Sequence, residues 1–330
     1  MGRLLRRSLA DNPTEWLMTV ALVVMCLVLT VTAPYFATPG NAINILDQAA
    51  AVGIVALGQT LVILEGGIDL SVGSVYGLSG VAGALVMVNF GMWPGIGAAL
   101  LVGAGVGLLN GVLISYLRLA PFMVTLAFLS IARSWDYVIT NSTSVTGLPQ
   151  EFSFLGTGSI AGVPFFVILM VAIYAIGHVV ASRARLGRYI YAIGNNAEAA
   201  RLAGVNVRLY RVVPYAVIGI LAAVAALVST SRLLSIDPNA GAGLELNTIA
   251  AVVIGGTSLF GGKGTIIGTA MGTLFVTVLT NGLNLMNVSP YWQGTAIGLV
   301  ILIAIGLPPT IRVVRDLMRA RSRGKRVTQG

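Results

Sequence analysis

Long apolar segments recur along the whole chain of 330 residues and constrain its fold more than any other feature. A helix needs about 20 apolar residues to cross a bilayer, which is more than a soluble core usually accommodates in segment after segment. Only 9% of the residues are charged. We therefore expect an all-α polytopic membrane protein with about ten transmembrane helices in one domain, 1–330. The expected spans are Trp16–Ala33, Ile45–Leu64, Val72–Val88, Gly95–Leu117, Phe122–Ile139, Pro164–Ala181, Val212–Ser231, Asn247–Phe260, Gly264–Met286 and Tyr291–Leu307.

The basic residues, which give a net charge of +9, cluster in the three segments 1–15, 182–211 and 308–330. Lys and Arg concentrate in the cytoplasmic segments of membrane proteins. We therefore expect a cytoplasmic N-terminal segment, a central cytoplasmic loop and a cytoplasmic tail. An even number of crossings agrees with having both termini on the same side. Nucleic acid is not an expected partner, because membrane topology explains the charge.

Two glycine-rich segments, near 66–74 and 255–264, interrupt the apolar pattern and predict broken or re-entrant helices. The stretch 247–260 is short for a full crossing and is expected to be a half-helix. At an offset of 189 residues, the pair Gly66-Gly67 aligns with Gly255-Gly256. This echo suggests two related halves that flank a central pathway.

Glycines also repeat every four residues within two of the expected spans. Small residues at this spacing form a flat helix face on which a neighbouring backbone can approach closely. The repeats are Gly103, Gly107 and Gly111, and then Gly264, Gly268 and Gly272. We expect these faces to pack helices together rather than to bind cargo.

Polar residues within the apolar segments are candidates for a pathway or gate, because such groups are costly in a bilayer without partners. Ser71 and Ser74 are expected to cap the helix that follows the first of the two predicted breaks. Arg133 and Asp136 are three residues apart and can pair on one helix face. For the charged candidates, a purely structural role as caps or as a self-satisfied pair is the competing interpretation. The candidates are Glu65, Asp69, Ser71, Asn110, Arg133, Asp136, Asn281 and Asn284, of which the asparagines are expected to face a hydrated cavity.

The sequence carries no recognisable catalytic machinery. It has one histidine, His178, and one cysteine, Cys26, and shows no Ser/His/Asp set, metal cluster or catalytic carboxylate pair. We therefore expect a protein that is not an enzyme and that holds no cofactor or metal of its own.

The central loop, 182–211, contains the run NNAEAARLAG from Asn195 to Gly204. Good helix formers lie there between an asparagine cap and a glycine stop, which predicts one short helix at the cytoplasmic surface. The flanking arginines either follow membrane topology alone, binding anionic lipid headgroups, or anchor this helix for a soluble partner. The candidate contact residues are Asn195, Asn196, Glu198, Ala199, Ala200, Arg201 and Gly204.

Four motifs in order resemble the permease subunit of bacterial ATP-binding-cassette sugar importers of the ribose, xylose and galactose type. They are GGIDLSVGS (Gly66–Ser74), PFMVTLAFLSIARS (Pro121–Ser134), GNNAEAARLAGVNV (Gly194–Val207) and VVIGGTSLFGGKGTIIGT (Val252–Thr269). The chain departs from the family pattern at Glu65, Ser134 and Asp136, where cargo is expected to pass.

The resemblance implies a multi-pass permease of the bacterial inner membrane that imports a monosaccharide such as ribose, xylose or galactose. It also implies three protein partners: a cytoplasmic ATPase with two nucleotide sites, an external sugar-binding protein and a second permease subunit. ATP and magnesium belong to the ATPase, whose groove would hold the helix at Asn195–Gly204. The segments 140–162 and 235–246 are expected to meet the binding protein.

Three other interpretations stay open from the residues alone. The same class of importer carries nucleosides or branched-chain amino acids in related permeases. An ion-coupled secondary carrier would use Asp69, Glu65 or Arg133 directly. A non-transporting scaffold would leave the polar residues within the spans unexplained.

Overall fold

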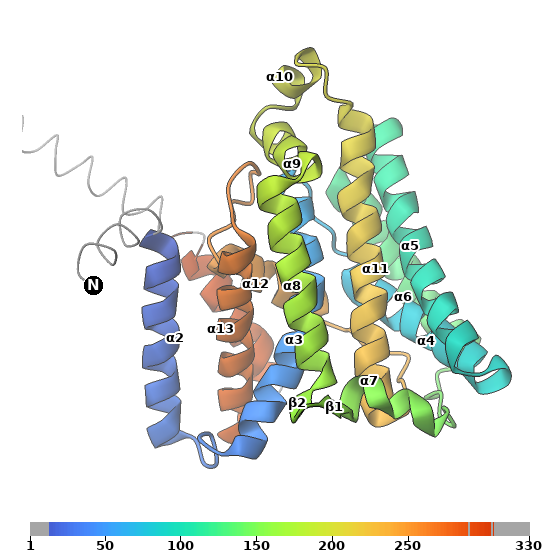
Figure 1. Ribbon diagram of the computed structural model, residues 1–330, viewed down its shortest axis with the longest axis vertical. Coiled ribbons are helices and arrows are strands. Elements are labelled where there is room, and N and C mark those ends of the chain that lie inside the picture. The colour runs from blue at the N-terminus through green and yellow to red at the C-terminus, as the bar shows by residue number, and fades with distance from the viewer. Residues whose placement is uncertain (1–12, 290, 305, 307–330) are drawn as a thin grey trace, which may run out of the picture.

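The computed structural model describes residues 13–289, 291–304 and 306, which form a bundle of helices (Figure 1). Seven of the described helices are long and apolar enough to cross a membrane: α3 (Pro39–Leu64), α4 (Val72–Phe90), α5 (Met92–Tyr116), α6 (Pro121–Thr140), α8 (Phe165–Arg183), α11 (Val207–Leu233) and α13 (Ile266–Leu285). Three further helices are apolar but shorter: Met18–Thr32 within α2 (Pro13–Thr32), α12 (Leu244–Ile254) and Tyr291–Ala304. The all-α membrane class is therefore confirmed, whereas the expected segments 1–15 and 308–330 lie largely or wholly outside the described residues.

The two ends of the bundle differ in structure. Helices α9 (Arg185–Asn195) and α10 (Ala197–Leu202) project beyond the long helices at the end called here the α10 end (Figure 1). The opposite end, the α7 end, carries a cap made of η1 (Gln150–Ser153), α7 (Phe154–Thr157) and the antiparallel strands β1 (Ser159–Ile160) and β2 (Val163–Pro164). A bridge between Val145 and Ile236 pairs the segment that precedes this cap with the connection between α11 and α12.

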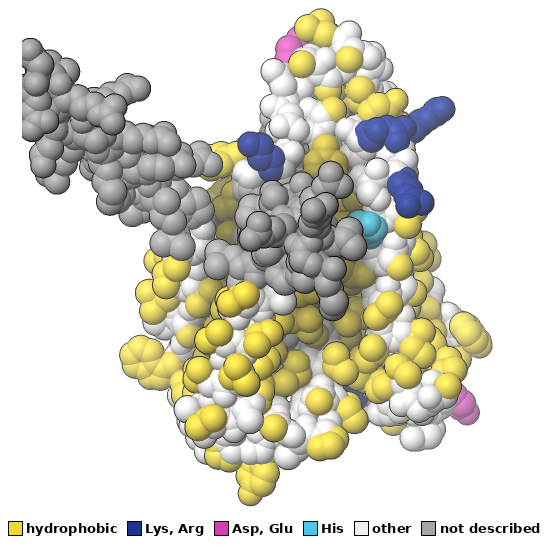
Figure 2. All heavy atoms as spheres, turned by 60° about the vertical axis from the view of Figure 1, so that its left-hand side comes forward, with side chains coloured by type: hydrophobic (Ala, Val, Ile, Leu, Met, Phe, Trp, Pro, Cys, Tyr) yellow, Lys and Arg dark blue, Asp and Glu magenta, His cyan; other side chains and the backbone are white. Residues whose placement is uncertain are grey.

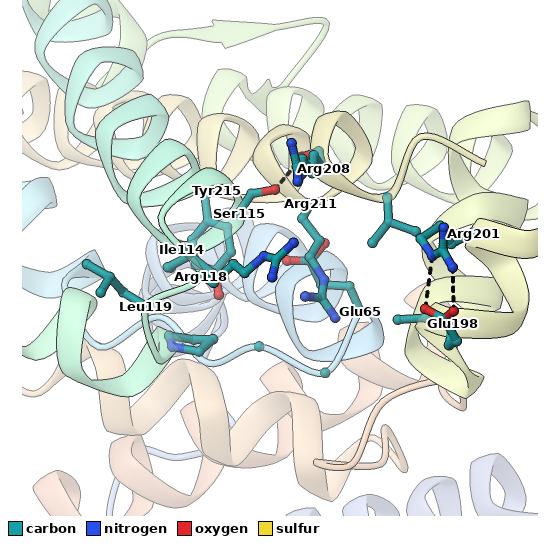
Figure 3. A pocket seen from close by; sticks show the side chains of 15 residues that line it. Glu65, Ile114, Ser115, Arg118, Leu119, Glu198, Arg201, Arg208, Arg211 and Tyr215 are labelled. Atoms are coloured by element: carbon teal, nitrogen blue, oxygen red, sulfur yellow. Dashed lines mark hydrogen bonds and ion pairs between the residues drawn. The ribbon is translucent and has the colours of Figure 1, made fainter. Parts of the chain in front are cut away.

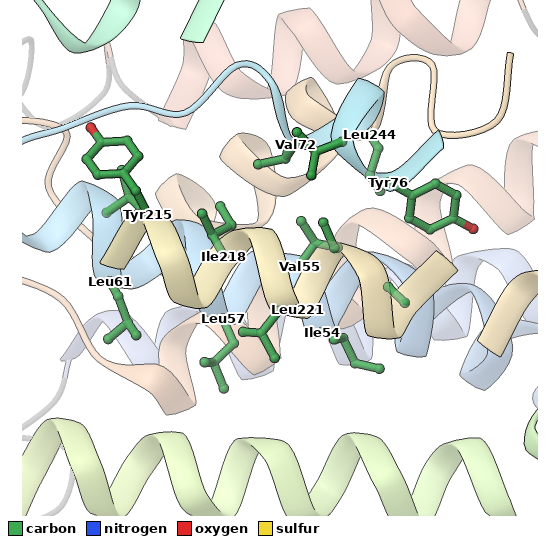
Figure 4. Close-up of a cluster of buried hydrophobic side chains, with 14 of the residues drawn as sticks. Ile54, Val55, Leu57, Leu61, Val72, Tyr76, Tyr215, Ile218, Leu221 and Leu244 are labelled. Atoms are coloured by element: carbon green, nitrogen blue, oxygen red, sulfur yellow. The ribbon is translucent and has the colours of Figure 1, made fainter. Parts of the chain in front are cut away.

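Helix α11 forms the centre of the core and packs against α3, α4 and α5. Figure 4 shows Ile54 and Leu57 of α3 and Ile218 and Leu221 of α11 among its buried side chains. The predicted glycine face of α5 is confirmed, because a Cβ at Gly107 would overlap the backbone of α11. Such close backbone packing makes this part of the bundle rigid.

The second predicted glycine face is correct for only two of its three members. Gly268 and Gly272 of α13 lie against the backbone of α12. Gly264 is not in the helix: α13 begins after Thr265, whose side-chain oxygen accepts a hydrogen bond from the backbone amide of Gly268 at 2.9 Å. Gly264 therefore belongs to the connecting segment, which ends at Thr265, the cap of α13.

Both predicted helix breaks are present, at 65–71 after α3 and at 255–265 after α12. Each helix ends on a glycine in the left-handed region, Gly66 with φ +89° and Gly256 with φ +88°. Two backbone hydrogen bonds of the same kind close each helix end, one from the amide of this glycine and one from the amide of the next residue. The two equivalent glycines, Gly66 and Gly256, are 190 residues apart, so the sequence alignment at an offset of 189 is wrong by one. Helix α12 has 11 residues, in agreement with the half-helix expected there.

Candidate functional site

Helix α10 is a short, capped and exposed element at the tip of the α10 end. Asn196 accepts a hydrogen bond from the backbone amide of Ala199 at 3.0 Å, so Asn196 is the cap and Asn195 is not. Gly204, with φ +85°, follows the helix, as predicted. Sequence reasoning missed Leu202, which is 73% exposed although it is apolar. An exposed leucine within a polar helix is the signal that could have identified it.

One exposed ion pair of α10, between Glu198 and Arg201, lies beside the pocket that Glu65 lines. The guanidinium donates two hydrogen bonds to the carboxylate, at 3.0 and 2.6 Å. These bonds lower the pKa of Glu198 below its ordinary value. Ala200, on the inner face, is buried. The helix therefore exposes the Glu198–Arg201 pair and Leu202, and it packs against the rest of the protein through Ala200.

The segment before α10, expected to be loop, is the amphipathic helix α9. Its apolar residues Leu186, Ile190 and Ile193 recur at helical spacing, and the two isoleucines are buried. Arg185 and Arg188 are exposed on the other side. This spacing was present in the sequence, but the run of arginines obscured it.

Helix α9 is bonded directly to the break that follows α12. The Tyr191 hydroxyl donates to the carbonyl oxygen of Gly264 at 2.8 Å, and the Asn195 amide donates to that of Gly262 at 3.2 Å. The backbone amide of Gly262 in turn donates to the carbonyl oxygen of Leu64 at 2.8 Å. Gly194 fits between Leu64 and Gly262 without room for a side chain. Helix α9 thus contacts the end of α3, where the first break begins, and the second break itself.

The break at 65–71 is buried in the bundle and is stabilised around Asp69. Its carboxylate accepts from the backbone amide of Ser71 at 2.8 Å and from the Ser71 hydroxyl at 2.6 Å. The side chain of Asn110 on α5 donates to the same hydroxyl at 2.9 Å. Ser71 occupies the N-cap position of α4 but makes no side-chain cap, and the Ser74 hydroxyl donates to the carbonyl oxygen of Ser71 at 2.9 Å. The expected serine cap is therefore wrong, and Asp69 closes this turn.

Two residues that sequence reasoning missed also bind this break. The side-chain amide of Gln59 faces the backbone of Asp69, with contacts of 3.2 and 3.3 Å in the orientation that satisfies both groups. The Thr125 hydroxyl donates to the carbonyl oxygen of Ile68 at 3.3 Å. Both are polar residues within apolar spans, which is the signal that also identified Asn110.

The predicted Arg133–Asp136 pair exists, at 3.8 Å, but Arg133 is bound mainly elsewhere. Its guanidinium donates to the carbonyl oxygens of Pro238 and Ala240, both at 2.9 Å, in the connection between α11 and α12. Asp136 is fully buried, and the two oxygens of its carboxylate have no hydrogen-bond partner among the described residues. Arg133 therefore fastens α6 to the connection that leads into α12.

The starts of the interrupted helices α4 and α12 meet inside the bundle. Gly73, in the first turn of α4, lies against Gly241 and against the carboxylate of Glu245, in the first turn of α12. Two helix N-termini, each the positive end of a helix dipole, thus converge near Asp69 and Asn110. Interrupted helices in this arrangement form polar sites within otherwise apolar bundles.

Two candidates lie away from this cluster. Asn281 exchanges side-chain hydrogen bonds with Asn41 at 2.8 and 3.0 Å and so joins α13 to the start of α3. Asn284 accepts a hydrogen bond from Gln293 at 2.6 Å. The expected hydrated cavity is thus replaced by amide pairing at Asn281, which is buried.

Glu65 lines a pocket of about 580 Å³ at the α10 end, bounded by the ends of α3, α5 and α11 and by α10 (Figure 3). On the outer surface, hydrophobic side chains cover much of the face in Figure 2, and basic side chains gather toward the α10 end near the histidine. This distribution separates an apolar belt from a basic end, as in proteins embedded in a bilayer.

Interrupted helices that meet around polar groups, in a bundle with an apolar surface, define a multi-pass membrane protein of the transporter type. The family model described as branched-chain amino acid transport system / permease component matches residues 41–305, and the chain belongs to that family. Its members are permease subunits, so the chain is a transport component and not an enzyme. The predicted resemblance is thereby confirmed.

Individual relatives are similar over most of their length. The chain is 42% identical to the ribose import permease protein of Escherichia coli strain K12, covering 88% of this chain and 93% of that protein. It is 41% identical to the ribose import permease protein of Bacillus subtilis strain 168, with coverage of 87% and 90%. It is 37% identical to the D-allose transport system permease protein of Escherichia coli strain K12, with coverage of 83% and 84%.

Proposed function

We propose that this chain is the membrane-spanning subunit of an ATP-driven sugar importer in the bacterial inner membrane. The observation that carries the proposal is helix α10, an exposed and capped element that is joined through α9 to both helix breaks. Relatives that import ribose and allose support a monosaccharide as cargo. The chain would supply the pathway, and ATP and magnesium would be held by a partner.

The topology that fits this function has ten crossings. The seven long helices and the three shorter ones account for them, with α12 completed by the connection that precedes it. The basic α10 end then faces the cytoplasm together with both termini, in agreement with the positive-inside rule. The α7 end, with its cap and the 235–243 connection, faces outward.

The partners follow from this orientation. An ATPase with two nucleotide sites would receive α10 in a groove, with Leu202 and the Glu198–Arg201 pair at the contact. An external sugar-binding protein would deliver cargo to the α7 end. A second permease, identical or related, would pair with this chain so that each α10 serves one nucleotide site of the ATPase. Cargo would pass near Asp69, Ser71 and Asn110.

Reconstitution into liposomes with the ATPase and binding protein tests this function. Ala200→Trp should abolish ATP-driven uptake, because a bulky side chain at this buried position displaces α10. Leu202→Ala, at an exposed position, should weaken ATPase binding and leave the fold intact. ATP-driven uptake that survives both changes would refute the coupling role of α10.

The same preparation separates the alternatives. Uptake that persists without the ATPase and collapses with an ion gradient would indicate a secondary carrier. Binding of nucleosides or branched-chain amino acids by the binding protein, in place of sugars, would reassign the cargo.

A further inference from the structure

The pocket beside Glu65 has an unusual excess of positive charge. Four arginines and two glutamates line it: Arg118, Arg201, Arg208, Arg211, Glu65 and Glu198. Its volume of about 580 Å³ is within the range of roughly 300–1,000 Å³ that is typical of small-molecule sites. The pocket lies at the α10 end, so the proposed orientation opens it to the cytoplasm and away from incoming cargo.

Most of this charge is not compensated within the protein. Arg201 is bonded to Glu198 at the side of the pocket (Figure 3). The guanidinium groups of Arg118, Arg208 and Arg211 make no ion pair or hydrogen bond with any residue that the structure describes. Arg211 attracts the Glu65 carboxylate but does not reach ion-pair distance. Three guanidinium groups therefore remain available to bind an anion.

Two buried hydrogen-bonding groups also lack partners at this pocket. Oε2 of Glu65, a residue that is 5% exposed, and the hydroxyl of Tyr215, which is 0% exposed, have no hydrogen-bond partner in the described part of the chain. Buried polar groups are normally satisfied, and each exception calls for a ligand or water. Figure 3 shows both residues beside Arg118 and Arg211 in the same hollow.

From these contacts we propose that the pocket binds a phosphate monoester that carries hydroxyl groups, the chemical class of a sugar phosphate. Guanidinium groups match phosphate oxygens bidentately, so Arg118, Arg208 and Arg211 would hold the phosphate. The Glu65 carboxylate and the Tyr215 hydroxyl would bond to the hydroxyl groups of the ligand. A bare phosphate would leave both of these groups unpaired.

Binding here would connect α10 to the ends of α3 and α11. Because α10 is the element that the proposed ATPase moves, an occupied pocket would hold it in place and slow the transport cycle. This regulatory consequence rests on the proposed function, whereas the binding itself does not. A phosphorylated product of the imported cargo would then restrain further import.

Calorimetry on the purified full-length protein in detergent tests the site with fructose 6-phosphate, fructose and inorganic phosphate as probes. Fructose 6-phosphate should bind, fructose should not, and inorganic phosphate should bind about tenfold more weakly or worse. Arg118→Gln or Arg211→Gln should each weaken fructose 6-phosphate binding about tenfold. Arg183→Gln removes the same charge outside the pocket and should leave the affinity unchanged.

Tyr215→Phe is the sharpest variant, because it keeps the buried ring and removes only the unpartnered hydroxyl. It should weaken fructose 6-phosphate binding and leave inorganic phosphate binding unchanged, with an unaltered melting temperature. The proposal is overturned if millimolar fructose 6-phosphate does not bind, if inorganic phosphate binds equally well, or if Arg183→Gln weakens binding as much as Arg118→Gln. It is also overturned if phosphatidylglycerol nanodiscs abolish binding and phosphatidylcholine nanodiscs do not, since lipid headgroups would then be the occupants.

Discussion

Gly194 is the position at which one added methyl group tests the coupling proposal most directly. It lies in α9, where a Cβ would meet the carbonyl oxygen of Leu64 and the amide nitrogen of Gly262. These two atoms form the 2.8 Å hydrogen bond that joins the end of α3, where the first break begins, to the second break. We predict that Gly194→Ala displaces α9 from both breaks and uncouples α10 from the spans.

Two opposing effects set the size of this displacement. Alanine is more favourable than glycine within a helix by about 1 kcal/mol. Forcing a methyl group into a packed contact costs about 1–3 kcal/mol, and stranding the two buried backbone groups costs about 1–3 kcal/mol more. The net cost is therefore about 1–5 kcal/mol, and even its lower limit shifts the ratio of docked to undocked α9 about fivefold.

The assay is the number of ATP molecules hydrolysed per sugar imported by proteoliposomes that contain the complete importer. Gly194→Ala should raise this ratio about fivefold or more. Gly105→Ala on α5 is the matched control, because a Cβ there meets nothing within 4 Å. An unchanged ratio in a folded Gly194→Ala variant that still binds the ATPase would refute the reasoning.

Three further predictions concern local stability. Asn196→Ala removes the cap of α10 and should destabilise it by about 1 kcal/mol, seen as faster amide hydrogen exchange. The pKa of Glu198 is lowered in the folded state, so its pair with Arg201 stabilises α10 above the unfolded pKa and loses that effect as the pH falls through the folded value. The protection of the α10 amides, relative to their intrinsic exchange rate at each pH, should thus stay constant on mild acidification and fall only in acid. A loss of protection near neutral pH would contradict this. Asn281→Ala leaves the buried Oδ1 of Asn41 without its hydrogen-bond donor and should lower stability by about 1–3 kcal/mol in thermal unfolding. An unchanged melting temperature would argue against a structural role.

The bundle could be predicted from the sequence because its spans and breaks obey local rules. Length and apolarity mark the spans, and paired glycines mark the ends of α3 and α12, where only glycine adopts the left-handed conformation without strain. The glycine face of α5 was predictable for the same reason. The position of Gly264 outside the helix was not predictable, because the four-residue glycine spacing continues across Thr265, the cap at which α13 starts.

The site was predicted residue by residue but not as an arrangement. Asp69, Ser71 and Asn110 were each recognisable as polar groups in apolar surroundings, yet nothing in the sequence indicated that α5 donates to the Ser71 hydroxyl. The partners of Arg133 were equally hidden, because they are backbone carbonyls about a hundred positions away. Helix α9 was not predicted for another reason: its arginines fit a cytoplasmic loop, and this charge pattern obscured the helical spacing of its apolar residues.

The two breaks are where force applied to α10 would first take effect. Within a long helix every interior backbone group is bonded to the same helix, and the close contact of α5 with α11 resists sliding. In the breaks, by contrast, backbone groups depend on side chains from other elements, such as Gln59 and Tyr191. Those bonds can exchange partners without unwinding a helix. A movement of α9 would therefore change the breaks before the spans, and through 65–71 it would reach the start of α4, where the two interrupted helices meet.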